Sequence, residues 1–204
     1  MTDDSDALIR DLERITQPAP GKLADLHQRL AAAAQHEGVL DIAYRVIDSP
    51  VGPLLLAATE HGLLRVAYAR EDHDAVLAQM AEKISPRILY APDRLDPAAR
   101  ELDEYFARTR RSFDLRLDWR LADGFRSTVL HHLPEIGYGQ TASYATVAAL
   151  AGSPKAVRAV GTACAKNPLP VVVPCHRVVR SDGAMGGYLG GPDAKRLLLD
   201  LEAA

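Results

Sequence analysis

Cysteine is scarce in this chain: its 204 residues include only two, Cys164 and Cys175. Two thiols are too few for the disulfide framework of a small secreted protein, and they fit a reducing compartment. Both lie in the C-terminal half, which excludes a cysteine-containing zinc site elsewhere. The seven histidines form no metal-ligand spacing, and the adjacent His131 and His132 would point apart on a helix. We therefore expect neither a metal ion nor a cofactor.

Long apolar runs are also missing, although 48% of the residues are hydrophobic and can build an ordinary core. No stretch approaches the length of a membrane span, and the acidic start Thr2–Asp6 is unlike a signal peptide. We expect a cytoplasmic protein that makes no contact with a membrane.

Acidic residues are absent from Pro154–Ser181, although the whole chain carries a net charge of −3. The same segment contains five basic residues: Lys155, Arg158, Lys166, Arg177 and Arg180. This concentration of positive charge is typical of a surface that faces phosphates. An ordinary solvated basic face is the alternative.

The segment Pro170–Arg180 combines a thiol, an imidazole and a guanidinium in consecutive positions. Its β-branched run predicts a buried strand that Pro174 ends, so that Cys175 lies where regular pairing stops. Cysteine nucleophiles react as thiolates, a form that a nearby base or cation favours, so we expect an anionic sulfur. In an extended segment Cys175 and His176 point to opposite faces, and a bridging water or a turn would have to connect them. A buried structural cysteine beside a capping histidine is the alternative.

Two short helices precede this segment. The first is predicted over Tyr144–Ala151, with Ser143 as its N-cap and Gly152 at its end. The second begins with Ser153 as N-cap and Pro154 at the first helical position, which makes a helix-turn-helix. One face of the second helix carries Val157, Val160 and Cys164, so Cys164 is interpreted as a core residue.

The remaining pattern predicts an α+β protein in three parts: a helical extension (1–39), an α+β domain (40–121) and a C-terminal domain (122–204). The extension reads as two helices, 5–15 and 22–36, that form either a cap on the body or an arm for a partner. The middle part predicts an antiparallel meander of strands 41–48, 54–59 and 63–68, helices 71–84 and 96–108, and a possible strand 113–119. Helices 125–133 and 192–202 begin and end the last part.

The C-terminal residues together resemble the O6-alkylguanine-DNA alkyltransferases. The resemblance covers about Phe125–Glu202 and rests on five features: Gly139-Gln140-Thr141 with Ser143-Tyr144, the helix start Gly152–Gly161, Asn167-Pro168, Pro174–Val179 and the loop Gly186–Gly191. It implies an N-terminal antiparallel sheet with helices, of ribonuclease-H-like topology, and a mostly helical C-terminal domain with a winged-helix-like helix-turn-helix. It also implies DNA repair by one irreversible transfer of the alkyl group from O6-alkylguanine, and from O4-alkylthymine, to Cys175 of a monomer.

The resemblance assigns the chemistry to five residues. Cys175 attacks the alkyl carbon, His176 takes the thiol proton through a water, and Glu202 orients the imidazole. Tyr144 donates a proton to N3 of the leaving guanine, and Asn167 braces the hinge before the thiol segment. A substrate pocket is expected from Pro170, Val178, Gly186, Tyr188 and Leu189. Pro170, Gly186 and Tyr188 would line the alkyl group. The carbonyls of Cys175 and Val178 would accept from the guanine amine, and the Leu189 backbone N–H would face O6.

The same resemblance makes double-stranded DNA the partner. Arg158 would fill the base stack after the nucleotide is flipped out, while Tyr144 crowds its phosphate. Lys155, Thr162 and Lys166 are expected on the same DNA-binding surface. Thr162 stands where the family often has Gly, and Leu189 where it has Ser or Ala, which predicts a narrower tolerance for large alkyl groups.

Three other functions share some of these features. A non-catalytic alkyltransferase-like sensor would lack the thiol of Cys175. A transcription factor accounts for the helix pair but not for Cys175-His176-Arg177. A cysteine hydrolase accounts for the thiol but not for Arg158 and Tyr144.

Overall fold

The computed structural model describes residues 21–203 and divides the chain into two compact units, Met1–Leu40 and Asp41–Ala204. In the first unit, helix α2 spans Lys22–His36, as predicted. Ala31 and Ala34 are buried on it, and the backbone N–H of Leu40 donates to the carbonyl of Ala34. The helix predicted over residues 5–15 lies outside the described residues, and the role of the extension stays a prediction.

The second unit begins with a sheet whose strand order is β3-β2-β1-β4. Strands β1 (Ile42–Ile47), β2 (Leu54–Thr59) and β3 (Gly62–Tyr68) form the predicted antiparallel meander. The expectation of a purely antiparallel sheet is wrong, because β4 (Ile88–Tyr90) pairs with β1 in parallel. A helix separates β4 from the meander and brings the chain back in the same direction as β1. The strand has only three residues, too few for a sequence pattern.

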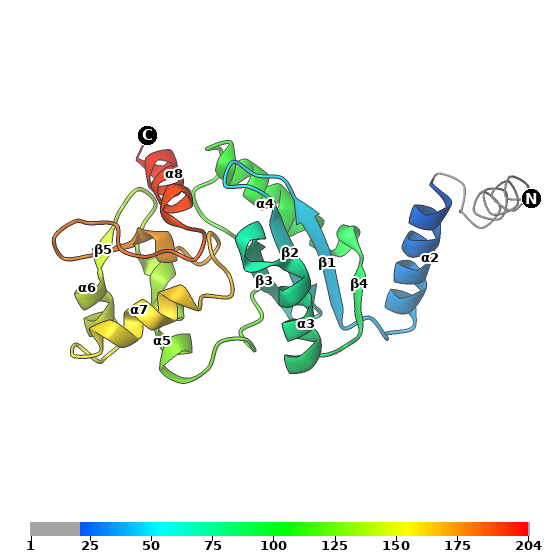
Figure 1. Ribbon diagram of the computed structural model, residues 1–204, viewed down its shortest axis with the longest axis horizontal. Coiled ribbons are helices and arrows are strands. Elements are labelled where there is room, and N and C mark those ends of the chain that lie inside the picture. Colours follow the sequence, from blue (N-terminus) through cyan, green and yellow to red (C-terminus); the bar gives the residue numbers. More distant parts are fainter. Residues whose placement is uncertain (1–20, 204) are drawn as a thin grey trace, which may run out of the picture. The chain divides into compact units, whose positions relative to one another are not determined.

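Helices cover both faces of this sheet (Figure 1). Side chains alternate along β2, so Leu55 packs with Val76 and Met80 of α3 (His73–Lys83). Leu54 and Leu56 face the opposite cluster, which includes Leu102 of α4 (Asp96–Phe106). The 3-10 turns η1 (Ala69–Glu71) and η2 (Pro92–Leu95) precede these two helices.

The strand predicted over 113–119 does not form. Only Leu117 makes a bridge, to Leu63 at the start of β3. Gly62 lies so close to the Arg116 carbonyl that a Cβ would collide with it. The segment therefore meets the sheet edge at a single point, and its apolar residues Phe113 and Leu115 pack on the core instead of extending a ladder.

The C-terminal half is mostly helical. Its helices are α5 (Gly124–His132), α6 (Tyr144–Leu150), α7 (Val157–Ala165) and α8 (Pro192–Glu202). Two residues of β5 (Ala142–Ser143) pair in parallel with β6 (Val178–Val179). Two 3-10 turns, η3 (Leu133–Glu135) and η4 (Cys175–Arg177), complete it. The whole unit is therefore a mixed α+β structure (Figure 1).

Two predicted elements of this half are corrected. Helix α7 begins at Val157, not at Pro154, because Ser153 to Ala156 form a turn closed by the Ala156 N–H and the Ser153 carbonyl at 2.8 Å. The expected strand before Cys175 is also wrong. Val171 has φ 72°, and the Val173 N–H donates back to the Leu169 carbonyl, so this buried run is a coiled turn. Burial was inferred correctly, but prolines at both ends prevent ladder pairing.

One hydrophobic cluster joins the two halves of the second unit. It contains Leu54 and Leu56 of the sheet together with Leu130, Val160 and Leu198 of the C-terminal helices. Direct hydrogen bonds also cross, including one of 2.9 Å from the Val66 N–H to the Pro168 carbonyl. Within residues 21–203, no helix combines the length and the apolar character that a membrane crossing requires.

Candidate active site and DNA-binding surface

Cys175 is the first residue of η4 and is only 1% exposed. Asn167 holds the loop around it. Its side-chain amide donates to the Cys175 sulfur at 3.1 Å and to the Val173 carbonyl at 2.8 Å, while its oxygen accepts from the Leu169 N–H. Asn167 thus contacts the Cys175 sulfur directly, and its role as a brace of the hinge stays a prediction.

The sulfur is a neutral thiol at rest, contrary to the expectation of an anion. Burial raises the pKa of Cys175 to about 11, although the hydrogen bond from Asn167 and the charge of Lys195 act in the opposite direction. A reaction of this sulfur as a thiolate would therefore need a base to take its proton. Cys164 is also buried, on α7 as predicted, and burial raises its pKa further.

His176 is fully buried and has the state that a base needs. Burial lowers the pKa of the imidazole despite its contact with Glu202, so the ring is neutral. Its Nε2 lies 2.8 Å from Oε1 of Glu202, which places the ring proton on Nε2. Nδ1 is buried without a hydrogen-bond partner among the described residues and is free to accept a proton.

Glu202 is the carboxylate on which the other groups converge. Arg177 donates to it through Nε at 2.8 Å and through a terminal nitrogen at 3.0 Å. The hydroxyl of Tyr105, from α4, donates at 2.6 Å. Burial alone would raise the pKa of Glu202, but the hydrogen bonds from His176 and Arg177 lower it to about 2. The carboxylate is therefore charged and fixes the imidazole.

Tyr144 lies at the other side of the site. It begins α6, where Ser143 caps the helix as predicted by accepting from the Thr146 N–H. Tyr144 borders a pocket of about 590 Å³ together with Gly161 of α7 and with Tyr188 and Leu189 of the glycine-rich loop. Burial raises the pKa of Tyr144, so its hydroxyl keeps its proton and can donate it.

The residues expected to line the substrate pocket are brought together only in part. Tyr188 and Leu189 line this 590 Å³ pocket, whereas Pro170 and Val178 are buried and do not. Gly186 packs against Tyr144, since a Cβ there would lie 2.9 Å from the Tyr144 hydroxyl. The Val178 carbonyl already accepts from Lys195 Nζ at 2.6 Å, which leaves one lone pair for another donor.

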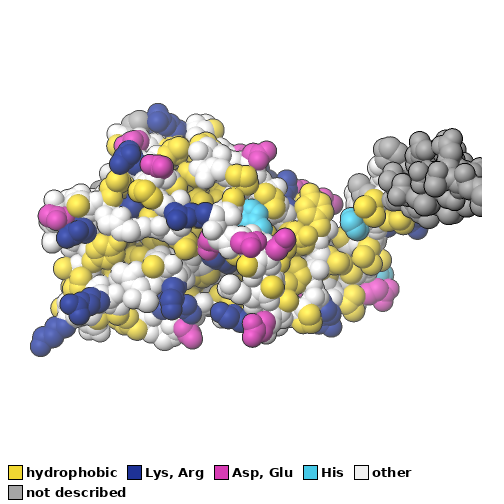
Figure 2. All heavy atoms as spheres, viewed as in Figure 1, with side chains coloured by type: hydrophobic (Ala, Val, Ile, Leu, Met, Phe, Trp, Pro, Cys, Tyr) yellow, Lys and Arg dark blue, Asp and Glu magenta, His cyan; other side chains and the backbone are white. Residues whose placement is uncertain are grey.

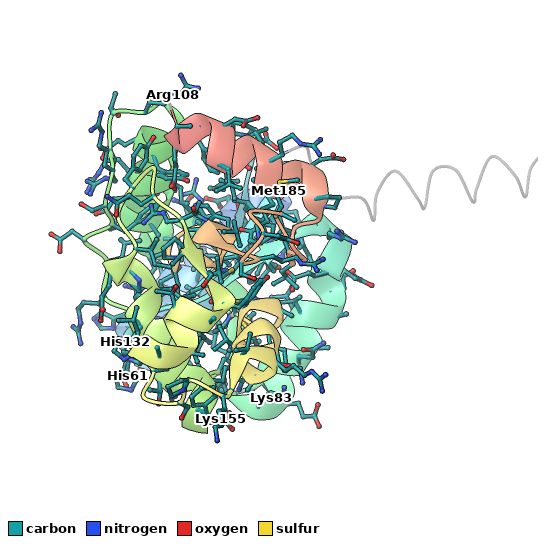
Figure 3. All side chains as sticks on the ribbon, turned by 90° about the vertical axis from the view of Figure 1, so that its left-hand side faces the viewer. His61, Lys83, Arg108, His132, Lys155 and Met185 are labelled. Atoms are coloured by element: carbon teal, nitrogen blue, oxygen red, sulfur yellow. The ribbon has the colours of Figure 1, made fainter. Side chains whose placement is uncertain are left out.

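Four of the five predicted DNA-binding side chains, those of Lys155, Arg158, Thr162 and Lys166, are exposed, and that of Tyr144 is half-buried. Arg158 and Thr162 are exposed on α7, where the Thr162 hydroxyl donates to the Arg158 carbonyl. Lys166 follows the helix, and Lys155 projects outward from the turn before it (Figure 3). Figure 2 shows Lys and Arg side chains interspersed with hydrophobic ones over α6 and α7. Arg177 belongs to the buried site instead, so it adds no charge to this surface.

Sequence reasoning missed three residues of the site. Lys195 is fully buried and donates to the carbonyls of Val178 and Met185. Met185 is labelled beside α8 in Figure 3. The Tyr68 hydroxyl, from β3, lies 2.8 Å from that of Tyr188. Tyr105 and Tyr68 are distant in sequence from the other site residues, and nothing in the local sequence marked them. Lys195 could have been found, because a lysine on the apolar face of the predicted helix α8 indicates a buried charged group.

A buried cysteine directly before a His-Glu pair, near a helix pair with the exposed Lys155, Arg158 and Lys166 on and around its second helix, is typical of a DNA-binding protein with a cysteine nucleophile. Among residues 21–203 no group of three or more His, Cys, Asp or Glu is arranged to hold a metal ion. The buried thiol, imidazole and carboxylate can supply nucleophilic and acid-base chemistry.

The comparisons with known proteins agree with this class. Residues 42–119 match the family "6-O-methylguanine DNA methyltransferase, ribonuclease-like domain", and residues 124–204 match its DNA binding domain. A methylated-DNA–protein-cysteine methyltransferase of Methanosarcina barkeri is 40% identical over 159 residues, 78% of this chain and 96% of the relative. The constitutive enzyme of Bacillus subtilis is 38% identical over 78% of this chain and 94% of its own.

Solved structures extend the comparison to the fold. The O6-methylguanine methyltransferase of Mycobacterium tuberculosis superposes with a TM-score of 0.69 at 36% identity, over 79% of this chain and 93% of its own. A structure of the protein from the same organism in complex with DNA gives a TM-score of 0.66, over 78% of this chain and 92% of its own. The chain therefore belongs to the 6-O-methylguanine DNA methyltransferase family. Its activity is that of a methylated-DNA–protein-cysteine methyltransferase, which repairs DNA by alkyl transfer.

Proposed function

We propose that this protein binds double-stranded DNA as a monomer and transfers the alkyl group of O6-alkylguanine, or of O4-alkylthymine, to the Cys175 sulfur once. The observation that carries the proposal is the Cys175 thiol, held by Asn167, directly before the hydrogen-bonded pair of His176 and Glu202, in a half of the chain that also exposes Lys155, Arg158 and Lys166 on and around α7. Only a protein that uses both a nucleophile and a DNA-binding surface accounts for this combination of residues. The sensor, the transcription factor and the hydrolase each leave one part unexplained.

The protonation states of Cys175, His176 and Tyr144 support an in-line displacement. The Cys175 proton passes through a bridging water to Nδ1 of His176, whose imidazolium is stabilised by the ionised Glu202. A carbon–sulfur bond forms while the bond between the alkyl carbon and O6 breaks. Tyr144, which keeps its proton, donates it to N3 of the leaving guanine. The product is a thioether that no neighbouring group can hydrolyse, so each molecule reacts once.

The DNA has to be deformed for this reaction, because a stacked base cannot reach a buried sulfur. The exposed Arg158 fills the vacated stack, and α6 with α7 acts as a winged-helix-like unit in the minor groove. Residues 122–204 form the DNA-binding domain, residues 40–121 the ribonuclease-H-like scaffold, and residues 1–39 a helical extension. The two family matches, over residues 42–119 and 124–204, support a boundary between the scaffold and the DNA-binding domain.

Titration with methylated-guanine DNA tests the single transfer. The protein should accept one methyl group per chain and then stop, while Cys175→Ala accepts none. Cys164→Ala is the matched control, because the Cys164 thiol is also buried but lies on α7, and this variant should retain full capacity. Repeated turnover by the wild-type protein would contradict the proposal.

Nucleotide flipping is tested with Arg158→Ala. This variant should lose most of its rate on duplex DNA, because nothing fills the vacated stack, yet keep its rate on free O6-alkylguanine base. Equal losses on both substrates would show that Arg158 does not serve flipping.

A further inference from the structure

A residue of the scaffold half stands at the mouth of the pocket that contains Tyr144. Arg70, in the turn η1 after β3, lines this pocket together with Glu71, Gly161 of α7 and Tyr188. The resemblance gives the scaffold half no contact with DNA. Arg70 nevertheless lines the pocket that Tyr144 borders, whereas Lys155 and Lys166, the basic residues before and after α7, do not.

The guanidinium of Arg70 has a defined place. It packs on the backbone of Gly191, where a Cβ would collide with one of its terminal nitrogens. Glycine at this position therefore allows Arg70 to lie across the end of the glycine-rich loop. The side chain remains exposed and keeps its donors available on the pocket side.

The acidic neighbours of Arg70 are already engaged with other groups. Glu71 forms an ion pair with Arg65 and accepts from the Tyr68 N–H at 2.9 Å. Asp72 caps α3 by accepting from the N–H groups of Asp74 and Ala75. Throughout residues 21–203, the structure shows no hydrogen bond or ion pair of the Arg70 side chain. Arg70 therefore contributes an uncompensated positive charge at the pocket mouth.

We propose that Arg70 binds a backbone phosphate of the lesion strand beside the extruded nucleotide. The inference rests on the proposed function, because a base inside the pocket leaves its flanking phosphates at the mouth. A guanidinium matches a phosphate with two parallel hydrogen bonds, and an unpaired one loses no internal partner on binding. The scaffold half thus contributes directly to DNA binding.

The salt dependence of DNA binding measures this contact. Each neutralised phosphate adds about 0.9 to the slope of log K against log salt concentration. Arg70→Gln should reduce the slope by about that amount and weaken binding about fivefold at moderate salt. Arg70→Lys should retain most of the slope. Arg196→Gln is the control, since Arg196 is an exposed arginine on α8 that borders a different pocket, and its slope should stay unchanged.

Two further readouts separate the outcomes. Alkyl transfer from free O6-benzylguanine, which has no phosphate, should proceed equally in wild type and Arg70→Gln. Replacing the phosphate beside the lesion with an uncharged methylphosphonate should weaken wild-type binding but not that of Arg70→Gln. An unchanged slope in Arg70→Gln, with a wild-type protein that transfers methyl groups, would overturn the Arg70 assignment alone. A wild-type protein that transfers none would overturn the proposed function.

Discussion

At the scale of single residues, Glu202 organises the site. It receives hydrogen bonds from His176 on η4, from Arg177 beside it and from Tyr105 on α4 of the scaffold. A buried carboxylate without such donors would be protonated. Because it is held ionised, it keeps His176 in the tautomer that leaves Nδ1 open as an acceptor.

The Glu202 carboxylate should make the free energy of unfolding depend on pH in the acid range. The pKa of Glu202 is about 2 in the folded protein against 4.5 for a free side chain. Its contribution to stability is therefore full above pH 4.5 and is lost as the pH falls towards 2. Urea unfolding of wild type and Glu202→Gln should show a smaller loss between neutral and acid pH in the variant. The exposed Glu60→Gln serves as control, and identical pH profiles for wild type and Glu202→Gln would contradict this role.

The residue roles differed in how far the sequence could predict them. The chemistry of consecutive residues such as Cys175 and His176 can be predicted from their types and spacing. Tyr105 lies 97 residues from Glu202, and nothing local marks the contact. The protonation state of Cys175 also required the structure, because it follows from burial rather than from the neighbouring basic residues.

At the scale of elements, the loops before and after Cys175 position the site more than the helices do. Asn167 closes the turn that carries Val171 in a left-handed conformation, and the loop Gly186–Gly191 lies against Tyr144 and Tyr68. Gly190 faces the Tyr68 ring so closely that a Cβ would be 2.6 Å from it. Glycine is therefore required where the loop contacts aromatic rings.

Two adjacent glycines allow a matched test. Gly186 has φ 67°, and a Cβ on it would lie 2.9 Å from the Tyr144 hydroxyl, whereas Gly187 has nothing within 4 Å. Gly186→Ala should displace Tyr144 and slow alkyl transfer by about tenfold or more, as misplacement of a catalytic group does. Gly187→Ala should react like wild type. Equal single-turnover rates for all three proteins would show that Gly186 does not set the position of Tyr144.

Periodic elements were predictable almost to the residue, as α2, β2 and α8 show. The errors lie where tertiary contacts override local pattern. Val171–Val173 has the composition of a strand but finds no partner between its prolines, and Ser153-Pro154 has a capping pattern but forms a separate turn. The short strand β4 exists only because β1 offers an edge.

At the scale of the molecule, the scaffold and the DNA-binding half behave as one body. The two halves share one hydrophobic core. Tyr105, Tyr68 and Arg65 of the scaffold also form hydrogen bonds with the C-terminal half. These contacts were not evident in the sequence, because they join residues that are far apart in the chain. They also explain how scaffold residues take part in the active site.

The shared core predicts cooperative unfolding of residues 41–204. Leu102→Ala, on the fully buried face of α4, should lower the free energy of unfolding by about 2–4 kcal/mol. Hydrogen exchange should then accelerate equally in β2 and in α7. Leu150→Ala, an exposed position on α6, should change exchange little in either. Acceleration confined to the scaffold after Leu102→Ala would show that the halves unfold separately.

Mapping the modified residue by mass spectrometry tests the central claim most directly. After incubation with duplex DNA that contains O6-methylguanine, the protein is digested and its cysteine peptides are compared. The account predicts one methyl group on Cys175 and none on Cys164. A methyl group on Cys164, or none on either cysteine while the DNA is repaired, would contradict it.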